Sequence, residues 1–371
     1  MNLLPATLVA LALAATAGLG ARAQEPPAAA PTERASFTEW LEGVRTEAVA
    51  RGIRRDPVDA ALATVEEPVP VVIERDRTQA EIVLPLETYL SRQLSKARIR
   101  TGREKMTANR ALLDTVAEQY GVPARIIAGI WGMESNYGRF SGVRPTVSAL
   151  ATLAWDPRRS TYFRGELFNA LQILDAGDVD LAHLKGSWAG ALGQPQFMPS
   201  SYLQYAQDYD GDGRRDIWQS NGDVFASIAN YLQGHGWTWG LPWGREVQVP
   251  ADVARTIATT IPRRTGSCSA RRDMTVALPL AEWRARGVTL VGGAPLPKAD
   301  VSASLVAGTT RFFLAYPNYD ALLEYNCAHA YALGVALLGD QIATPAPPAA
   351  RRRGPARAPA RTPKARPRAK R

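Results

Sequence analysis

Residues 123–138 read PARIIAGIWGMESNYG, an apolar run that ends in a single carboxylate, Glu134. Pro123 suits the first turn of a helix and Gly138 a position beyond its end, so the segment predicts a helix with Glu134 in its last turns. There the helix macrodipole and the apolar neighbours both disfavour the charged carboxylate, which raises its pKa. A raised pKa allows a carboxylic acid to donate a proton near neutral pH. The alternative is a Glu whose side chain only emerges where the helix leaves the core.

Further motifs follow downstream. Residues 186–202 read GSWAGALGQPQFMPSSY, residues 208–216 read DYDGDGRRD, and residues 229–232 read ANYL. In this order and spacing, the motifs and the Glu134 segment resemble the membrane-bound lytic murein transglycosylase B family, whose core is lysozyme-like. The likeness runs from about residue 37 to about residue 342. Several long motifs in register are more specific than a single short pattern.

The resemblance and the local patterns predict a mainly α (α+β) fold with a lysozyme-like core. The expected parts are a signal peptide at 1–23, a flexible leader at 24–35, an N-terminal helical region at 36–115, a lysozyme-like catalytic core at 116–244 with an EF-hand-like loop at 208–223, a small β-containing insertion at 245–316, a C-terminal helix at 317–342 and a disordered basic tail at 343–371.

Hydrophobic periodicity predicts the individual elements. A capping box, Ser36 with Glu39, begins a helix that ends near Gly52. Other helices are expected at 109–120, 164–176, 224–233 and 319–338. Short β-branched runs predict strands at 246–249, 288–291 and 311–315.

The net charge of +9 is concentrated at the C-terminus. Residues 344–371 carry ten Lys or Arg and no acid, so the rest of the chain sums to 9 − 10 = −1. This tail alternates Pro and Ala with basic residues and has almost no apolar bulk, so we expect it to be disordered. It either attaches to an anionic wall or membrane surface or is a solvated extension. Nucleic acid is not expected as a partner, because the N-terminus predicts export.

Residues 3–20 are uncharged and largely apolar, and Ala21-Arg22-Ala23 is a small-x-small site. This predicts a signal peptide cleaved after Ala23 and a periplasmic protein, with an uncleaved anchor as the alternative. The first 30 residues contain no cysteine for lipidation. Cys268 and Cys327 either form one disulfide or remain two buried thiols.

The family resemblance implies the reaction. Glu134, as the sole acid and base, would cleave the β-1,4 bond between N-acetylmuramic acid and N-acetylglucosamine without water, leaving a 1,6-anhydro end. An ordinary glycosidase needs a second carboxylate, for which Asp156 is the nearest candidate and equally a turn residue. The alternatives are a hydrolytic muramidase and a non-catalytic wall-binding protein.

The resemblance also implies a sugar-binding groove. Ser187 and Gln196 would hydrogen-bond the sugars, although Pro195 leaves the direction of Gln196 open. Arg158 and Arg159 resemble a pair that meets peptide-stem or lactyl carboxylates. The remaining groove positions carried over from the family are Tyr89, Tyr231, Asn326 and Tyr331.

The acidic loop matches an EF-hand up to its ninth position. It departs at the twelfth, which is Gln219 rather than a bidentate Glu, and the family's longer loop implies that Asp223 closes the site. The pattern favours a structural Ca²⁺ or Na⁺ site over an unmetallated acidic turn. Its ligands would be Asp208, Asp210, Asp212, the Arg214 carbonyl, Asp216 and Asp223. No cofactor is expected for catalysis, and we expect a monomer that binds peptidoglycan glycan strands.

Overall fold

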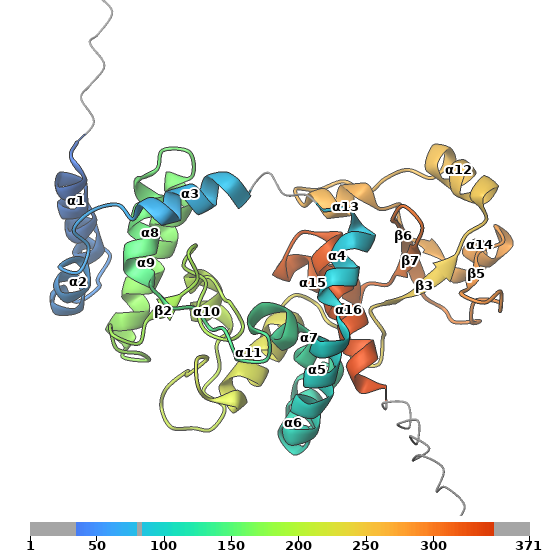
Figure 1. Cartoon of the computed structure of the whole chain (residues 1–371), viewed down its shortest axis with the longest axis horizontal. Helices are drawn as coiled ribbons and strands as arrows, with labels where there is room; N and C mark the ends of the chain where they lie inside the picture. The colour runs from blue at the N-terminus through green and yellow to red at the C-terminus, as the bar shows by residue number, and fades with distance from the viewer. Residues whose placement is uncertain (1–34, 80–83, 345–371) are drawn as a thin grey trace, which may run out of the picture. The chain divides into compact units, whose positions relative to one another are not determined.

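The computed structural model describes residues 35–79 and 84–344 and is built mainly from helices (Figure 1). The predicted signal peptide, leader and basic tail lie outside the described residues except at their innermost positions. Among the described helices, none combines the length and the hydropathy that a membrane span requires.

One group of helices packs around α8 (Thr146–Trp155) and α9 (Ser160–Ala176), which lie against each other. The helices α1 (Phe37–Ala50), α2 (Arg55–Leu62) and α3 (Pro70–Gln79) belong to this group, since α2 contacts both α8 and α9. The predicted apolar face of α1 is confirmed, because Leu41, Val44 and Ala48 are buried.

A second group surrounds α7 (Ala124–Ser135), which packs on α16 (His329–Ala343). Around this pair lie α4 (Leu86–Gln93), α5 (Lys96–Ala108) and α6 (Arg110–Tyr120). The two helices are in close contact at Gly129, which has no side chain. A Cβ at this position would lie only 2.7 Å from the Val335 carbonyl oxygen. The expected N-terminal helical region at 36–115 is therefore divided between two groups, one on each side of the 80–83 gap.

The helices α10 (Pro199–Tyr205) and α11 (Asn221–Gly234) join the two groups, since α10 contacts α9 and α11 contacts α6 and α7. A short antiparallel pair, β1 (Arg144–Pro145) with β2 (Lys185–Gly186), leads into the motif at 186–202. Buried residues from both groups form one continuous hydrophobic core.

The predicted insertion forms an antiparallel five-stranded sheet in the order β4-β6-β7-β3-β5 (Figure 1). It has its own core, which includes Trp283, Leu305 and Leu314. The strand β6 was not predicted, although its run SASLVA is mostly buried. The elements are β3 (Gly244–Gln248), α12 (Ala251–Thr260), α13 (Ser269–Asp273), β4 (Leu278–Pro279), α14 (Leu280–Ala285), β5 (Thr289–Leu290), β6 (Ser302–Ala307) and β7 (Phe312–Ala315).

The expected single C-terminal helix at 317–342 is two helices, α15 (Asn318–Tyr325) and α16. The chain leaves the helical conformation at Asn326, whose φ is −153° and ψ is 120°. Next to this break, Cys327 forms a disulfide with Cys268 at the start of α13. Of the two alternatives for the cysteines, the structure therefore has the disulfide, which joins the insertion to the α15–α16 link.

Candidate active site

Glu134 lies in the last turn of α7, where the chain turns sharply out of the helix. Asn136 caps the helix in the left-handed conformation at φ 51°, and Tyr137 follows at φ 60°. The predicted helix is therefore confirmed, with Pro123 as its N-cap residue. The helical residues before Met133 are buried from Ile126 onward, while Glu134 itself is half-buried and keeps some contact with solvent.

The phenol of Tyr331 on α16 donates a hydrogen bond of 2.5 Å to Oε1 of Glu134. Burial raises the pKa of the Glu134 carboxyl to about 7, and the Tyr331 hydrogen bond opposes that rise by stabilising the carboxylate. Glu134 can thus exist in both protonation states near neutral pH, as one group serving first as acid and then as base requires.

Two other phenols surround the same carboxylate. The Glu134 charge adds to burial in raising the pKa values of Tyr89, on α4, and of Tyr325, at the end of α15. Tyr325 lies parallel to Tyr331, with ring centroids 6.2 Å apart and planes 17° apart. Tyr89 and Tyr331 are among the groove positions predicted from the sequence, whereas Tyr325 is not, since its only local signal is an aromatic ring directly before Asn326.

The motif at 186–202 is held against α7 by a hydrogen bond between side chains. The indole nitrogen of Trp131 donates to Oε1 of Gln194 at 2.6 Å, and Nε2 of Gln194 donates to the Trp218 carbonyl at 2.8 Å. The turn needs glycine at 193, because φ is +61° there and a Cβ would lie 2.6 Å from the Ile217 carbonyl oxygen. Close packing of backbone segments thus accounts for this glycine.

The two predicted sugar-binding side chains in this motif are engaged with its backbone. Ser187 Oγ accepts from the N–H groups of Ala189 at 3.2 Å and Ala191 at 3.1 Å. Gln196 has a φ of 55°, and its Nε2 donates to the Gly193 carbonyl at 2.7 Å. Both side chains retain partial exposure, so each can offer its remaining hydrogen-bonding capacity outward.

Tyr231 packs on Tyr325 with ring centroids 4.7 Å apart and donates a 2.8 Å hydrogen bond to the Glu324 carbonyl. Tyr325 in turn donates to the Pro195 carbonyl at 2.8 Å. Pro195 thus contacts one of the phenols that face Glu134. Asn326 is exposed in the link between α15 and α16, with Cys327 beside it.

Arg158 and Arg159 share one acidic partner that the sequence analysis missed, the buried Asp76 on α3. Their guanidinium nitrogens lie 2.8 Å and 3.0 Å from its carboxylate oxygens. Asp156 also pairs with Arg158, whose side chain lowers the pKa of the Asp156 carboxyl, and accepts the Arg158 N–H at 3.1 Å. Asp156 is therefore a turn residue that stays ionised. Because its salt bridge with Arg158 favours the ionised form, Asp156 is not suited to donate a proton as a second acid.

Arg159 and its partner Asp76 line a surface pocket of about 360 Å³. Tyr162, a half-exposed residue of α9, lies in this pocket together with Arg159 and Trp188. The pocket reaches the motif at 186–202 through Trp188, Ala189 and Met198. A separate row of contacts leads from Glu134 through Tyr331 and Tyr325 to Tyr231.

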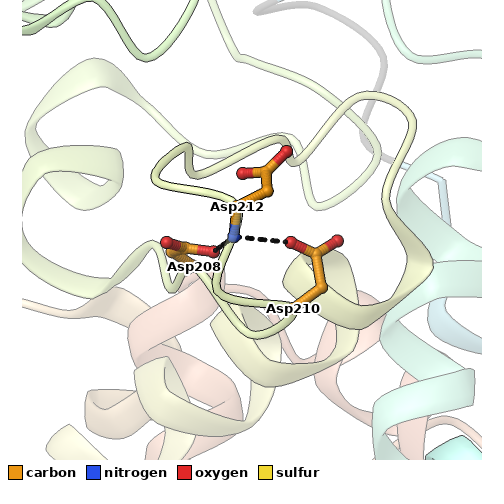
Figure 2. Close-up of side chains that lie close together, drawn as sticks. All are labelled: Asp208, Asp210 and Asp212. Carbon is orange, nitrogen blue, oxygen red and sulfur yellow. Dashed lines mark hydrogen bonds between the residues drawn. The ribbon is translucent and has the colours of Figure 1, made fainter.

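The acidic loop brings three carboxylates together. Oxygen atoms of Asp208, Asp210 and Asp212 lie within 4.8 Å of one another, and all three residues are exposed (Figure 2). Asp208 accepts from the N–H groups of Gly211 and Gly213, at 2.8 and 2.9 Å, so it also shapes the turn. Clustered carboxylate oxygens are the donor type that Ca²⁺ prefers.

The other predicted ligands of this loop have different partners. Asp223 is fully buried, and its oxygens accept from the N–H groups of Tyr209 at 2.8 Å and Asp216 at 2.6 Å. Asp216 accepts from the N–H of Trp218 at 2.9 Å, and Arg214 donates its N–H to Asp212 at 2.8 Å. Asp223 therefore ties together both ends of the loop, outside the group of three carboxylates.

Comparison with known proteins identifies relatives over most of the chain. A family model described as "Transglycosylase SLT domain" matches residues 36–340. Membrane-bound lytic murein transglycosylase B of Escherichia coli K12 is 35% identical over 237 residues, which are 62% of this chain and 60% of that protein. The match therefore spans less than two thirds of that relative's length.

Solved structures of similar proteins share the fold. SltB3 from Pseudomonas aeruginosa, in complex with NAG-NAM-pentapeptide, is 41% identical with a TM-score of 0.75, covering 83% of this chain and 79% of that one. The Escherichia coli lytic transglycosylase Slt35, in complex with calcium, is 29% identical with a TM-score of 0.67, covering 82% and 92%. These matches confirm the predicted lysozyme-like, mainly helical class.

Proposed function

The chain belongs to the transglycosylase SLT domain family, and on this premise we propose that it is a lytic transglycosylase. Its substrate is the β-1,4 bond between N-acetylmuramic acid and N-acetylglucosamine in peptidoglycan. The observation that carries the proposal is the half-buried Glu134, with a pKa of about 7 and the Tyr331 phenol at 2.5 Å. The relative SltB3, solved with NAG-NAM-pentapeptide, supports the substrate class.

In the proposed reaction Glu134 acts twice. Its carboxylic acid protonates the glycosidic oxygen as the bond to C1 breaks, and N-acetylglucosamine leaves with a hydroxyl. The carboxylate then removes the proton of the muramic acid 6-hydroxyl, whose oxygen bonds to C1. Glu134 is protonated again, no water is consumed, and the product ends in a 1,6-anhydro ring. Within residues 35–79 and 84–344, the titratable groups beside Glu134 are the phenols of Tyr89, Tyr325 and Tyr331 and none is a carboxylate, which favours this route over a two-carboxylate hydrolysis.

The other groove residues bind the glycan strand in this proposal. Ser187 and Gln196 offer hydrogen bonds to N-acetyl or hydroxyl groups, while the buried Tyr231 supports Tyr325 by packing against its ring. Arg158 and Arg159 meet acidic groups of the peptide stem or lactyl ether. Their shared partner Asp76 holds the two guanidinium groups in place, which supports a fixed binding position.

We also assign a structural cation to the loop of Asp208, Asp210 and Asp212. Three exposed carboxylates within 4.8 Å repel one another, and a bound Ca²⁺ or Na⁺ would neutralise that repulsion. The Slt35 relative is described in complex with calcium. Asp223 holds the loop ends by accepting hydrogen bonds from the N–H groups of Tyr209 and Asp216.

For location, we propose export to the periplasm, where peptidoglycan lies, on the strength of the apolar stretch at 3–20 and the small-x-small site before Gln24. The basic tail then meets an anionic wall or membrane surface.

The chemistry is tested by digesting purified peptidoglycan in water enriched in ¹⁸O and weighing the products. A transglycosylase leaves anhydro ends that are lighter than hydrolysed ends by one water and carry no ¹⁸O. A hydrolytic muramidase leaves reducing ends that each carry one ¹⁸O atom. Release of the second kind of end alone would contradict the proposal, as would folded protein that pellets with the wall and releases nothing.

A further inference from the structure

The insertion is joined to the wall of the active site by a cluster of ion pairs. Arg271 on α13 lies 3.2 Å from the Asp320 carboxylate and 2.7 Å from that of Glu324, both on α15. Arg264 adds two contacts to Asp320, at 3.0 and 3.1 Å. These arginines are partly buried, with 23% and 29% of their side chains exposed, so their positions are restrained by packing as well as by charge.

A covalent bond joins the same two regions. Cys268 directly precedes α13 and is bonded to Cys327, in the link that follows α15. Ser269 Oγ also lies 3.8 Å from the Cys327 sulfur. Helix α15 and the link behind it are therefore held to the α13 region at both ends, by Asp320 in the first turn of α15, and by Glu324 in its last turn and Cys327 in the link.

The segment held in this way carries Tyr325. Its ring stacks on Tyr331, and Tyr331 donates to Glu134. A continuous series of contacts therefore connects α13 to the proposed catalytic carboxylate, by way of α15, Tyr325 and Tyr331. Such a series can transmit a displacement, because close-packed groups cannot move independently.

We propose that α13 of the insertion is a brace for the active site, with Arg271 and the Cys268–Cys327 disulfide as positioning residues that hold Tyr325 and Tyr331 against Glu134. The inference rests on the proposed function for its link to catalysis. Neither Arg271 nor the disulfide contacts Glu134, so both act through the tyrosines. A placement error of about 1 Å in a catalytic group can lower the rate by up to about 100-fold.

The brace also controls the environment of the carboxylate. The titratable groups that face Glu134 are the phenols of Tyr89 on α4, Tyr325 on α15 and Tyr331 on α16. Burial raises the pKa of Glu134, and the Tyr331 hydrogen bond opposes that rise with a smaller effect. If the α15 wall loosens, Tyr331 is held less firmly against Glu134 and this hydrogen bond weakens, so the pKa of the carboxyl rises further, as in Tyr331→Phe.

The test is a double-mutant cycle on peptidoglycan turnover. We expect Arg271→Ala to lower kcat/KM by about tenfold, mainly through kcat, and to move the alkaline limb of the pH profile to higher pH. Arg271→Lys keeps the charge and should retain most of the activity. In a Tyr331→Phe background the same Arg271→Ala change should cost less than about twofold, because its effect has already been removed.

A matched control is Arg286→Ala, which removes the ion pair with Glu282 inside the insertion and touches neither α15 nor the groove. Each variant is assayed well below its melting temperature. If Arg271→Ala does not fold, the cycle is made with the Cys268→Ser, Cys327→Ser pair, or by reducing the disulfide of the folded wild type, with the same expected losses.

The brace is overturned by folded variants whose kcat/KM and pH profile stay within about twofold of wild type, or by equal losses in both backgrounds. A wild-type protein that releases no product would instead overturn the proposed function. The brace is then tested without turnover, by NMR titration of Glu134, whose pKa should rise in Arg271→Ala. An unchanged Glu134 pKa in that variant overturns the brace.

Discussion

Tyr331 donates a 2.5 Å hydrogen bond to Glu134 across 197 residues of sequence, from α16 to the end of α7. The carboxyl it meets is held by burial at a pKa of about 7, so the phenol is bonded to a group that changes charge near neutral pH. The contact is possible because α7 and α16 pack closely. At Gly339, for example, a Cβ would lie only 2.6 Å from the Arg125 carbonyl oxygen.

Removing the phenol should shift the pH profile in a defined direction. Tyr331→Phe retains the burial but loses the hydrogen bond that favours the carboxylate, so the pKa of Glu134 rises further. We expect the alkaline limb of kcat/KM to move to higher pH and the optimum rate to fall by about tenfold. A pH profile that stays in place, or one that moves to lower pH, would contradict this role for Tyr331.

Glu134 should also reduce the stability of the folded protein at alkaline pH. Its folded pKa of about 7 exceeds the ordinary 4.5, so the stability it contributes is full below pH 4.5 and is lost as pH rises to 7. Glu134→Gln cannot ionise, so its free energy of unfolding should not show this loss. Relative to wild type it should increase by about 1 to 3 kcal/mol on going from pH 4 to pH 8, after discounting for partial exposure. Urea titrations at the two pH values measure this, with the exposed Glu118→Gln as a control that should show no such difference.

Calcium should stabilise the protein through the acidic loop. A ligand present at 100 times its Kd stabilises the folded state by about 2.7 kcal/mol, and the melting temperature should rise accordingly. Asp210→Asn should weaken this response, because Asp210 is one of the three clustered carboxylates. Asp252→Asn, at an exposed acid of α12 in the insertion, should leave it intact. A melting temperature that does not rise with millimolar calcium would contradict the proposed cation site.

Packing of α7 on α16 should be sensitive to a single methyl group. Gly129→Ala places a Cβ 2.7 Å from the Val335 carbonyl, and we expect a loss of about 1 to 3 kcal/mol in the free energy of unfolding. The matched change Gly165→Ala lies on the exposed face of α9 with nothing within 4 Å, and it should stabilise by up to about 1 kcal/mol. Equal effects of the two changes in a denaturant titration would contradict the close helix contact.

The main helices could be predicted because their signals are local. The segment at 123–138 combines an apolar run with terminal signals, and its helix is found at Ala124–Ser135. The expected helix at 109–120 is found at Arg110–Tyr120, and the one at 224–233 lies within Asn221–Gly234. In α6 the buried face repeats with the helical period, whereas α7 and α11 are apolar runs that are buried on all sides over two turns.

The break between α15 and α16 had no comparable signal. The residues on both sides are helix formers with apolar periodicity, so local preference predicted a continuous helix from 319 to 338. The structure ends α15 at Tyr325, and the disulfide of Cys327 lies next to the break. The pairing partner, Cys268, is 59 residues away, and such a tertiary constraint cannot be deduced from a local pattern.

The site residues also divide into those with a local sequence signal and those whose role depends on contacts made only in the folded chain. Glu134 could be predicted because it is a single carboxylate at the end of an apolar helix. Asp76, the partner of the Arg158–Arg159 pair, is 82 residues from Arg158, and nothing in its own helix marks it. Tyr325 was missed for a related reason, since its importance comes from Tyr331 and Pro195, which only the folded chain brings beside it.

The most direct test of the account is the release of anhydro-ended fragments from peptidoglycan by wild type and by Glu134→Gln, with the folding of both checked by thermal melting. We predict at least a thousandfold lower rate for the variant, because general acid–base catalysis contributes about 10² to 10⁴ and this single group would perform both transfers. A folded Glu134→Gln protein that releases anhydro ends at a rate within about tenfold of wild type would contradict Glu134 as the acid and base.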